Sequence, residues 1–327
     1  MKFVIIGSGS IAGTYARALA NAPDAELSGI VSRSGRAPAG APEGIEVAPS
    51  LDAIKAPFDA VIVATPNGLH HLGIAAAARL GKHVICEKPL GISIPAMETA
   101  LRACAENKVK LAVSYQRRLA PDNMIVKELL EQGKLGRVFA CELQVKFYRD
   151  QAYYDSAPYR GNKALDGGGP FIQQGSHNID LYAWFFGRPE KTVSMMGTFL
   201  HQIEGEDYGV AILKHADGMI GTITASTNCH PGFPARITIH SDLGYLVLEN
   251  DVIVQWQMGE LPNPSVSAGL KLHSGAGSAA VSNTSGHEAV ISDFIEAVRF
   301  DREPAVSGEA ARTATEIIID IYGANQY

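Results

Sequence analysis

The sequence has few cysteines and no run of basic residues, and each absence narrows the possible functions. Its four cysteines lie far apart and form no C-x-x-C pair: Cys86, Cys104, Cys141 and Cys229. This spacing signals neither a disulfide framework nor a zinc site, and the histidines form no metal-binding array, so we expect no metal. The formal net charge is −6, and no stretch of Lys or Arg could follow a phosphate backbone. We therefore expect no nucleic-acid partner.

Long apolar runs are missing as well. No stretch approaches the roughly 20 apolar residues that a membrane helix needs, so no membrane partner is expected. The first apolar run, residues 2–6, is too short for a signal peptide and leads directly into a glycine turn. A reducing cytoplasm is the location that these features favour.

Length and composition indicate two folded domains. The 327 residues exceed what one hydrophobic core usually supports, and 46% hydrophobic with 19% charged residues is typical of globular proteins. In residues 1–118 short apolar runs alternate with helical patterns, the signature of parallel βαβ units. We therefore expect a Rossmann domain with a doubly wound parallel sheet at 1–118. Its expected strands are 2–6, 26–32, 59–64, 82–86 and 109–115.

The rest of the chain, residues 119–327, has a different pattern. Long strand-like segments are separated by tight turns such as 215–218, which favours an antiparallel or mixed sheet. We expect an α+β domain with a large open, mostly antiparallel sheet. Its expected strands are 136–148, 190–202, 206–215, 219–227, 235–241, 244–249 and 251–257.

Helices are expected at both ends of this second domain. One follows Pro121, at 121–132, and two closing helices are expected at 286–299 and 307–322. The stretch 258–284 is rich in Gly, Ser, Pro and Asn and is expected to form a long loop.

The turn after the first strand carries a dinucleotide-binding pattern. Gly7-Ser8-Gly9-Ser10-Ile11-Ala12 fits G-x-G-x-x-A between a strand and a helix that starts near Ser10. Gly7 permits the tight turn, Gly9 allows a pyrophosphate to approach the backbone, and Ala12 allows close packing. The N–H groups of Ser10 and Ile11 would face the phosphates. The glycine spacing is weak evidence alone, but its place in a βαβ series predicts cofactor binding.

The end of the second strand indicates which dinucleotide is bound. NAD sites usually have a carboxylate there, whereas this strand ends in Ser32-Arg33-Ser34. With no carboxylate to repel a 2′-phosphate and with Arg33 available to bind it, NADP is favoured over NAD. The alternative is that Arg33 stacks on the adenine or faces solvent.

Two further strands end in polar residues at the same expected sheet edge, where open α/β sheets bind ligands. The strand 60–64 runs into Thr65-Pro66-Asn67 and His70, which are expected to contact the cofactor unless they form a simple turn. The strand 83–86 ends in Glu87-Lys88-Pro89, whose proline would aim Lys88 at the nicotinamide.

These motifs together resemble the Gfo/Idh/MocA family. The resemblance rests on 7–12, Thr65-Pro66-Asn67 with His70, Glu87-Lys88-Pro89, and Gly167-Gly168-Gly169 followed by His177 and Asp180, and it covers nearly the whole chain. It implies an NAD(P)-dependent oxidoreductase of sugars, sugar derivatives or cyclitols, with Lys88 near the reacting hydroxyl. It also implies a homodimer or homotetramer formed through the C-terminal sheet.

The segment from Gly169 to Leu181 is expected to be a helix with proline in its first turn and Gly187 at its end. Gln173, His177 and Asp180 would then project from one face and meet the substrate. The alternative for His177 is a hydrogen-bonded packing role. Many family members have an aspartate in place of Gln173, and the amide is similar to the UDP-N-acetyl-sugar 3-dehydrogenase branch. An amide exchanges no proton, so a relay from His177 is in doubt.

Three other residues are weaker candidates for substrate binding. Arg118 follows the last Rossmann strand, and Tyr154 and Arg160 lie in the tyrosine-rich segment before the glycines. A salt bridge or an exposed side chain is an equally good interpretation of the arginines.

The catalytic hypothesis assigns Lys88 and His177 to one reaction. Either His177 accepts the hydroxyl proton while Lys88 stabilises the alkoxide, or Lys88 itself is the base. Two other functions remain open: an NAD-dependent glycosidase that oxidises its sugar transiently, and a nucleotide-sensing regulator without turnover. The latter would predict loss of Lys88 and His177, and both are present.

Overall fold

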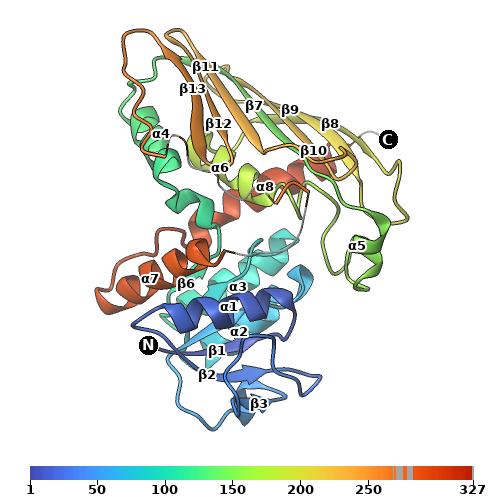
Figure 1. The fold of residues 1–327 in the computed structure, drawn as a ribbon, viewed down its shortest axis with the longest axis vertical. Coiled ribbons are helices and arrows are strands. Elements are labelled where there is room, and N and C mark those ends of the chain that lie inside the picture. Colours follow the sequence, from blue (N-terminus) through green and yellow to red (C-terminus); the bar gives the residue numbers. More distant parts are fainter. Residues whose placement is uncertain (268, 270–274, 278–282, 326–327) are drawn as a thin grey trace. The chain divides into compact units, whose positions relative to one another are not determined.

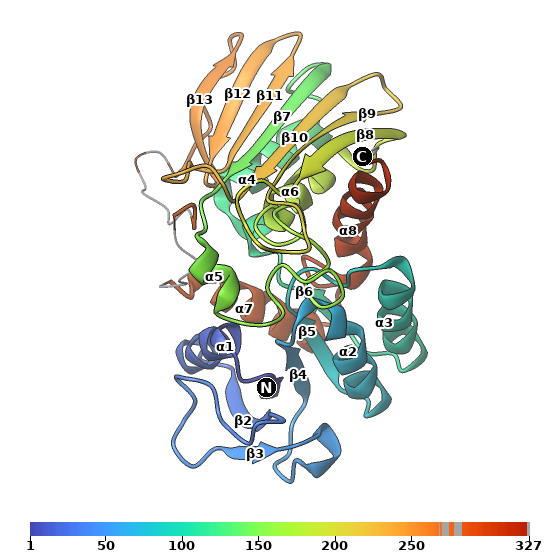
Figure 2. The same cartoon turned by 90° about the vertical axis from the view of Figure 1, so that its right-hand side faces the viewer.

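The chain divides into two compact units. The computed structural model describes residues 1–267, 269, 275–277 and 283–325 (Figures 1 and 2). The first unit comprises Met1–Gln116 and Val281–Arg312, and the second comprises Arg117–Ala280 and Thr313–Tyr327. The sequence suggests one boundary at residue 118, whereas the chain returns to the first unit for residues 281–312.

The first unit contains a six-stranded parallel sheet; the sequence predicts a parallel sheet and five of these strands, but not the short edge strand at 46–48. The strand order is β3-β2-β1-β4-β5-β6, so the connections reverse direction between β1 and β4. Such a reversal is the place where open α/β sheets bind ligands. The strands are β1 (Lys2–Ile6), β2 (Glu26–Val31), β3 (Glu46–Ala48), β4 (Ala60–Val63), β5 (His83–Cys86) and β6 (Leu111–Val113).

Helices cover both faces of this sheet, which explains why β4 is apolar at every position. One pair, α1 and α7, packs together on one face, and α2 and α3 pack together on the other (Figure 2). Phe294 of α7 contacts Phe3 of β1, with ring centroids 6.4 Å apart. The helices are α1 (Ser10–Asn21), α2 (His70–Arg79), α3 (Ile94–Glu106) and α7 (Ser285–Arg299).

The second unit contains a seven-stranded sheet in the order β13-β12-β11-β7-β10-β9-β8. Every pair is antiparallel except β7 and β10, which confirms the mostly antiparallel sheet that the sequence predicts. The strands are β7 (Val138–Lys146), β8 (Lys191–Gly197), β9 (Tyr208–Lys214), β10 (Ile220–Ser226), β11 (Arg236–Ser241), β12 (Gly244–Glu249) and β13 (Val252–Met258).

Among the described residues, helices cover only one face of this sheet. Along β7, Cys141, Leu143 and Val145 are buried, whereas Glu142 between them is exposed. Figure 1 shows the helices of this unit on one side of the sheet and none of this unit's described helices on the other. The helices are α4 (Pro121–Glu131), α5 (Gln151–Asp155), α6 (Ser176–Phe186) and, from Thr313 onward, α8 (Gly308–Gly323). Three short 3-10 helices span Leu51–Ala53, Asn67–Leu69 and Gln116–Leu119.

One helix prediction is wrong at its start. The helix expected from Gly169 begins only at Ser176, and residues 170–175 form turns before it. Gln173 therefore lies outside the helix and does not share a helical face with His177 and Asp180. The expected loop 258–284 falls partly outside the described residues, and its described part past Met258 contains no helix or strand. Within the described part of the chain, no helix is both long and apolar enough to cross a membrane.

Candidate functional site

The carboxyl ends of β1, β4 and β5 are held together at the switch point of the first sheet. Gly7 donates its N–H to Val31 O at 2.9 Å, Ala64 donates to Ile6 O at 2.9 Å, and Glu87 donates to Val63 O at 2.9 Å. The glycine turn, the Thr65 loop and the Glu87-Lys88 segment therefore start from one edge.

The glycine turn is shaped as a dinucleotide-binding turn. Gly7 has φ +130°, and a Cβ there would lie 2.4 Å from Ala64 O, so no other residue fits. A Cβ on Gly9 would meet no described atom within 4 Å, which leaves open space beside the backbone. Ser10 and Ile11 open α1, whose first N–H groups have no partner within the helix, and Ala12 is fully buried. This arrangement fits a phosphate bound at the helix start.

Three serines with Arg33 surround the end of β2. Ser32 Oγ lies 3.1 Å from Ser8 Oγ and 2.9 Å from Ser34 Oγ, which joins the glycine turn to the β2 loop. Arg33 is exposed between the two serines of its loop. No carboxylate occurs in residues 32–34.

In the loop that begins at Thr65, one buried polar side-chain atom forms no hydrogen bond with the described residues. Thr65 Oγ1 is buried, and no described residue forms a hydrogen bond with it. Pro66 precedes the short 3-10 helix that Asn67 begins. A buried hydroxyl without a protein partner at a ligand-binding edge fits a contact with a bound group.

His70, which the sequence predicts as a cofactor contact, is fully buried, and both of its ring nitrogens contact backbone carbonyl oxygens. Its Nδ1 lies 2.7 Å from Pro89 O and its Nε2 lies 2.9 Å from Thr65 O. Burial lowers the pKa of His70, although both carbonyl contacts oppose that shift. His70 therefore connects the Thr65 loop to the segment that carries Lys88.

Glu87 is likewise occupied within the first unit. It is 7% exposed, and its Oε1 accepts a hydrogen bond from Tyr15 at 2.9 Å and lies 3.6 Å from His287 Nε2. Its Oε2 accepts the backbone N–H of Lys88 at 3.1 Å. Burial raises the pKa of Glu87, but the hydrogen bond and charge of His287, with Lys88 and Tyr15, outweigh it and lower the pKa. Glu87 is thus an ionised anchor next to half-buried Lys88.

In the second unit, His177 lies in the first turn of α6. Its side chain is half-buried, between fully buried Ser176 and nearly buried Asn178. Gln173, in the preceding turn, donates from Nε2 to Asp166 O at 3.1 Å. This hydrogen bond ties Gln173 to Asp166, which immediately precedes the glycines 167–169.

Asp180 and Arg118 form a buried ion pair. Arg118 Nε donates to Asp180 Oδ2 at 2.7 Å, and Arg118 also donates to Oδ1 at 2.6 Å. Asp180 is fully buried and Arg118 is 4% exposed. Burial raises the pKa of Asp180 to about 6, against the opposing charge and hydrogen bonds of Arg118. The pair ties α6 to the segment before α4, and little of either side chain can reach a ligand.

In the tyrosine-rich segment, the Tyr154 hydroxyl has a hydrogen-bond partner, whereas the Nε of Arg160 has none among the described residues. Tyr154 is buried, and its hydroxyl lies 2.8 Å from Thr227 Oγ1. Arg160 is half-buried, and its guanidinium lies 4.1 Å from the centre of the Tyr153 ring. Arg160 Nε is buried and bonds to no described residue. Arg160 is thus the better placed of the two to bind an anion.

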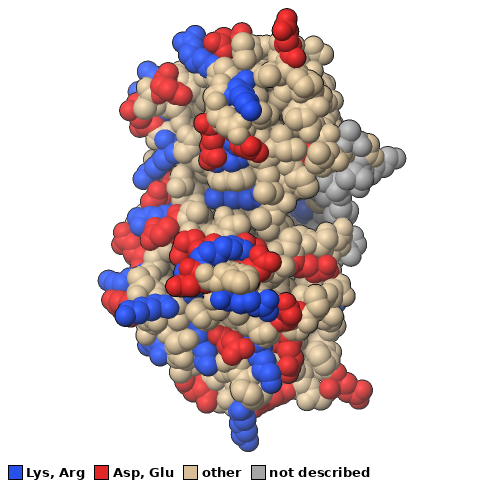
Figure 3. Space-filling view, turned by 90° about the vertical axis from the view of Figure 1, so that its left-hand side faces the viewer, with Lys and Arg blue, Asp and Glu red and all other residues tan. Residues whose placement is uncertain are grey.

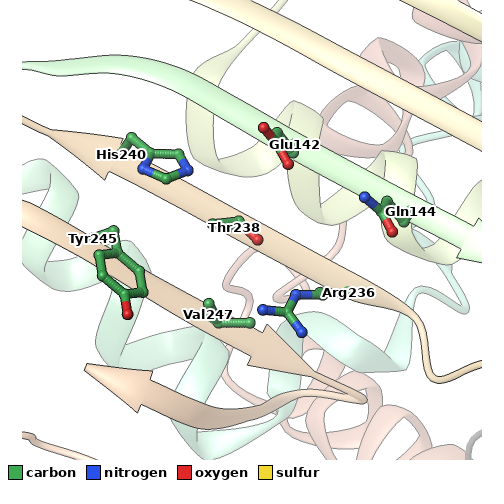
Figure 4. Close-up of a pocket in the computed structure, with 7 residues that line it drawn as sticks. All are labelled: Glu142, Gln144, Arg236, Thr238, His240, Tyr245 and Val247. Carbon is green, nitrogen blue, oxygen red and sulfur yellow. The ribbon is translucent and has the colours of Figure 1, made fainter. Parts of the chain in front are cut away.

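The open face of the second sheet has a polar half and an apolar half. A hollow of about 410 Å³ lies on the polar half, over β7, β11 and β12 (Figure 4). Its lining residues are Glu142, Gln144, Arg236, Thr238, His240, Tyr245 and Val247. On the molecular face drawn in Figure 3, basic and acidic side chains are interspersed rather than gathered by sign. Among the described residues no cluster of His, Cys, Asp or Glu could hold a metal ion.

Several residues that hold the site could not be found from the sequence. Tyr15 and His287 contact Glu87, and Ser114 contacts Tyr15, but the three residues come from distant segments without a shared motif. Glu206, which binds the N–H groups of Gly169 and Phe171, was missed for the same reason.

Comparisons with known proteins agree with this geometry. Residues 1–115 match the description "Oxidoreductase family, NAD-binding Rossmann fold", and residues 124–247 match "GFO/IDH/MocA C-terminal domain". The chain is 30% identical to an inositol 2-dehydrogenase of Rhizobium meliloti over 260 residues, 76% of each chain.

Two further proteins are similar. The scyllo-inositol 2-dehydrogenase (NADP(+)) IolW of Bacillus subtilis is 30% identical over 183 residues, 56% of this chain and 49% of that protein, so about half of its length is matched. The crystal structure of the WlbA dehydrogenase from Bordetella pertussis, in complex with NADH and UDP-GlcNAcA, has a TM-score of 0.84 at 28% identity. That match covers 99% of this chain and 95% of WlbA. With its Rossmann unit, its Glu87-Lys88-Pro89 segment and its open second sheet, the chain belongs to the Gfo/Idh/MocA family of NAD-binding oxidoreductases.

Proposed function

We propose that the protein oxidises a secondary alcohol of a sugar derivative, or reduces the matching ketone, with a nicotinamide dinucleotide. The observation that carries this proposal is the edge of the first sheet. The Gly7 turn, the unbonded Thr65 hydroxyl and the anchored Lys88 segment all leave from neighbouring strand ends there. When bound, the nicotinamide supplies the acceptor for the hydride that leaves the alcohol carbon.

Lys88 and His177 are the proposed catalytic residues. As the alcohol carbon loses its hydride, the hydroxyl oxygen must lose a proton and become a carbonyl oxygen. The imidazole of His177 is suited to accept that proton, and Lys88 is a cation suited to stabilise the developing negative charge. In the reverse assignment, Lys88 is the base. Gln173, Asp180, Arg118 and Tyr154 then act by holding the segments around His177 rather than by touching substrate.

The proposed substrate class is a sugar nucleotide or another anionic sugar derivative. Arg160 supports this choice, because its buried Nε bonds to no described residue. A guanidinium in that state is suited to bind a phosphate or carboxylate. The UDP-GlcNAcA in the similar WlbA structure points to the same class. The similarity to an inositol 2-dehydrogenase makes a cyclitol the second candidate.

For the cofactor, we propose NADP in preference to NAD. The three hydroxyls of Ser8, Ser32 and Ser34 with the exposed Arg33 form a polar and cationic site without a carboxylate. Such a site suits a 2′-phosphate. IolW carries NADP(+) in its name, whereas the WlbA structure contains NADH, so the similar proteins include both.

We also propose that two or four copies associate through the open face of the second sheet. The apolar half of that face supports this, because Val193, Met195, Ile212 and Ile220 are 42–59% exposed there. Apolar patches of this kind usually mark interaction sites. A cytoplasmic location stays a prediction of the sequence.

The first test is a substrate panel assayed with NAD and NADP in parallel. UDP-N-acetyl sugars, UDP-sugar acids, free monosaccharides and cyclitols should be compared by nicotinamide absorbance. We expect turnover with an anionic sugar and a lower KM for NADP. Turnover of cyclitols alone would contradict the anionic substrate. A retained nucleotide with glycoside cleavage and no net absorbance change would instead indicate a glycosidase.

The second test replaces the two catalytic residues. Lys88→Met and His177→Leu should each lower kcat by about 100-fold to 10,000-fold, because each removes a proton-transfer or charge-stabilising group. Binding of the reduced nucleotide, followed by its fluorescence, should stay within about twofold. Normal kcat in both variants would contradict the proposed mechanism.

A further inference from the structure

Glu87 belongs to a cluster of four buried polar side chains in the first unit. Four elements of the first unit contribute to it: Tyr15 from α1, Glu87 after β5, Ser114 after β6, and His287 from α7. Each of these side chains is at most 7% exposed. A buried carboxylate is costly unless it is fully hydrogen-bonded, so the four groups must be considered together.

The contacts show which group donates a hydrogen bond to which in this cluster. Tyr15 Oη lies 2.9 Å from Glu87 Oε1 and 2.6 Å from Ser114 Oγ. A carboxylate oxygen only accepts, so the phenol proton goes to Glu87, and the Ser114 hydroxyl supplies its own proton. His287 Nε2 faces the same Oε1 at 3.6 Å, and its ring packs edge-on against Tyr15 with centroids 5.0 Å apart.

The other carboxylate oxygen of Glu87 contacts the main chain of Lys88. Glu87 Oε2 accepts the backbone N–H of Lys88 at 3.1 Å, and the carbonyl of the next residue, Pro89, lies 2.7 Å from His70 Nδ1. The main chain of Lys88 is therefore held on both sides by buried side chains. Because Oε1 is shared by Tyr15 and His287, those two residues fix the orientation of the carboxylate that holds Lys88.

We propose that His287 and Tyr15 are positioning residues of the reaction, which act on Lys88 through Glu87. The inference rests on the proposed function, because it assigns to these residues the placement of a catalytic lysine. It gives α7 a role that its place in the chain does not suggest. The helix follows the whole second sheet in sequence, yet it belongs to the first unit and contributes a buried side chain to the Lys88 segment.

The test compares His287→Leu with His287→Gln and with a matched control. His287→Leu should lower kcat by about 10-fold to 100-fold, the loss that a misplaced catalytic group typically causes. KM and the dissociation constant of the reduced nucleotide should stay within about twofold. His287→Gln keeps an N–H donor towards Glu87 and should recover most of kcat. Tyr15→Phe, which removes only the phenol oxygen, should lower kcat in the same way.

His215→Leu is the matched control. His215 is also 5% exposed and also contacts a buried tyrosine, with its Nε2 2.6 Å from Tyr182 Oη, but it lies in the second unit. This variant should lose thermal stability to a similar degree and keep its kcat.

The outcomes separate the inference from the proposed function. Wild-type kcat in His287→Leu and Tyr15→Phe, with only a lower melting temperature, would overturn the positioning role. Equal kcat in His287→Leu and His287→Gln would overturn it as well. Wild-type kcat in Lys88→Met would remove the catalytic lysine on which the inference rests, whereas a wild-type protein that turns over no member of the substrate panel would contradict the proposed function itself.

Discussion

Asp122 in the second unit is a buried carboxylate surrounded by donors. It accepts hydrogen bonds from Ile253 N at 2.9 Å, Ser265 Oγ at 2.6 Å, Val266 N at 3.1 Å and Ser267 N at 3.2 Å. Burial raises the pKa of Asp122, but these hydrogen bonds outweigh it and hold the pKa below its usual value. The carboxylate thereby fastens α4 to β13 and to the segment that follows β13.

Asp122→Asn should therefore destabilise the protein. The amide replaces one acceptor oxygen by a donor that faces other donors, at a cost of about 1–3 kcal/mol in the free energy of unfolding. Because the folded-state pKa of Asp122 is lowered, its stabilisation is present above about pH 4 and is lost as the pH falls through the folded-state pKa. Urea unfolding at neutral pH and below pH 4 measures this.

Exposed Asp52 provides the control for that measurement. Asp52→Asn should change the free energy of unfolding by less than about 0.5 kcal/mol at either pH. A difference between wild type and Asp122→Asn that stayed constant down to pH 2 would show that the ionised carboxylate is not the stabilising form.

Single residues were predicted best where their chemistry is local. Gly7 needs its positive φ and Gly9 leaves open space, as the G-x-G-x-x-A pattern indicates. The sequence could not show that Arg118 would bind Asp180 or that Glu87 would bind His287, because those pairings depend on contacts between distant segments. A polar residue beside a motif is equally compatible with a ligand contact and with a buried partner.

At the scale of elements, hydrogen bonds to Glu206 hold the segment before α6 that contains the glycines 167–169. The carboxylate of Glu206 accepts the N–H of Gly169 at 2.9 Å and of Phe171 at 3.1 Å, and Tyr322 of α8 donates to it at 3.1 Å. A Cβ on Gly169 would lie 1.7 Å from Glu206 O. The segment can approach Glu206 only because residue 169 has no side chain.

Gly169→Ala should consequently lower the free energy of unfolding by about 1–3 kcal/mol, the usual cost of overpacking a rigid site. Urea denaturation followed by circular dichroism measures it. Gly323→Ala is the matched control, since a Cβ there meets nothing within 4 Å. The control should be neutral or slightly stabilising. Equal stability of the two variants would mean that the Glu206 contact can relax without cost.

The predicted helix starts too early because the turns after Gly169 do not continue into α6. Gln173 donates its N–H to Gly169 O, four residues back, but Gly175 donates to Pro170 O, five residues back, so the helical hydrogen-bond pattern is interrupted before Ser176. The strands were predicted more accurately, because period-2 alternation reports which side of a sheet is buried. Their predicted ends run past the ladders, as with 190–202 against Lys191–Gly197 of β8, since alternation does not show where pairing stops.

At the scale of the whole molecule, the sequence indicated two fold types but not the return of the chain. Residues 285–299 have an ordinary amphipathic pattern that would suit either unit. What assigns α7 to the first unit is its packing against α1 and β5 and the contact of Phe294 with Phe3 of β1. Such long-range contacts leave no local pattern in a single sequence.

The open face of the second sheet leads to a prediction about assembly. Met195 on β8 pairs with Val210 on β9, and the same face presents Val193 and Ile212, which are 42% and 51% exposed. Met195 itself is 59% exposed. If a second copy covers this face, a charge at Met195 would be buried without a partner, which proteins tolerate poorly.

Met195→Asp should therefore shift the protein towards the monomer by at least about tenfold in the association constant, the effect of about 1.4 kcal/mol. Sedimentation velocity over a concentration series measures the shift. Met124→Asp is the matched control, because Met124 is 51% exposed on α4, on the helical side of the same unit. That variant should assemble like the wild type. A wild-type protein that stays monomeric at every concentration, or a Met195→Asp variant that associates as tightly as the wild type, would rule out this face as the interface.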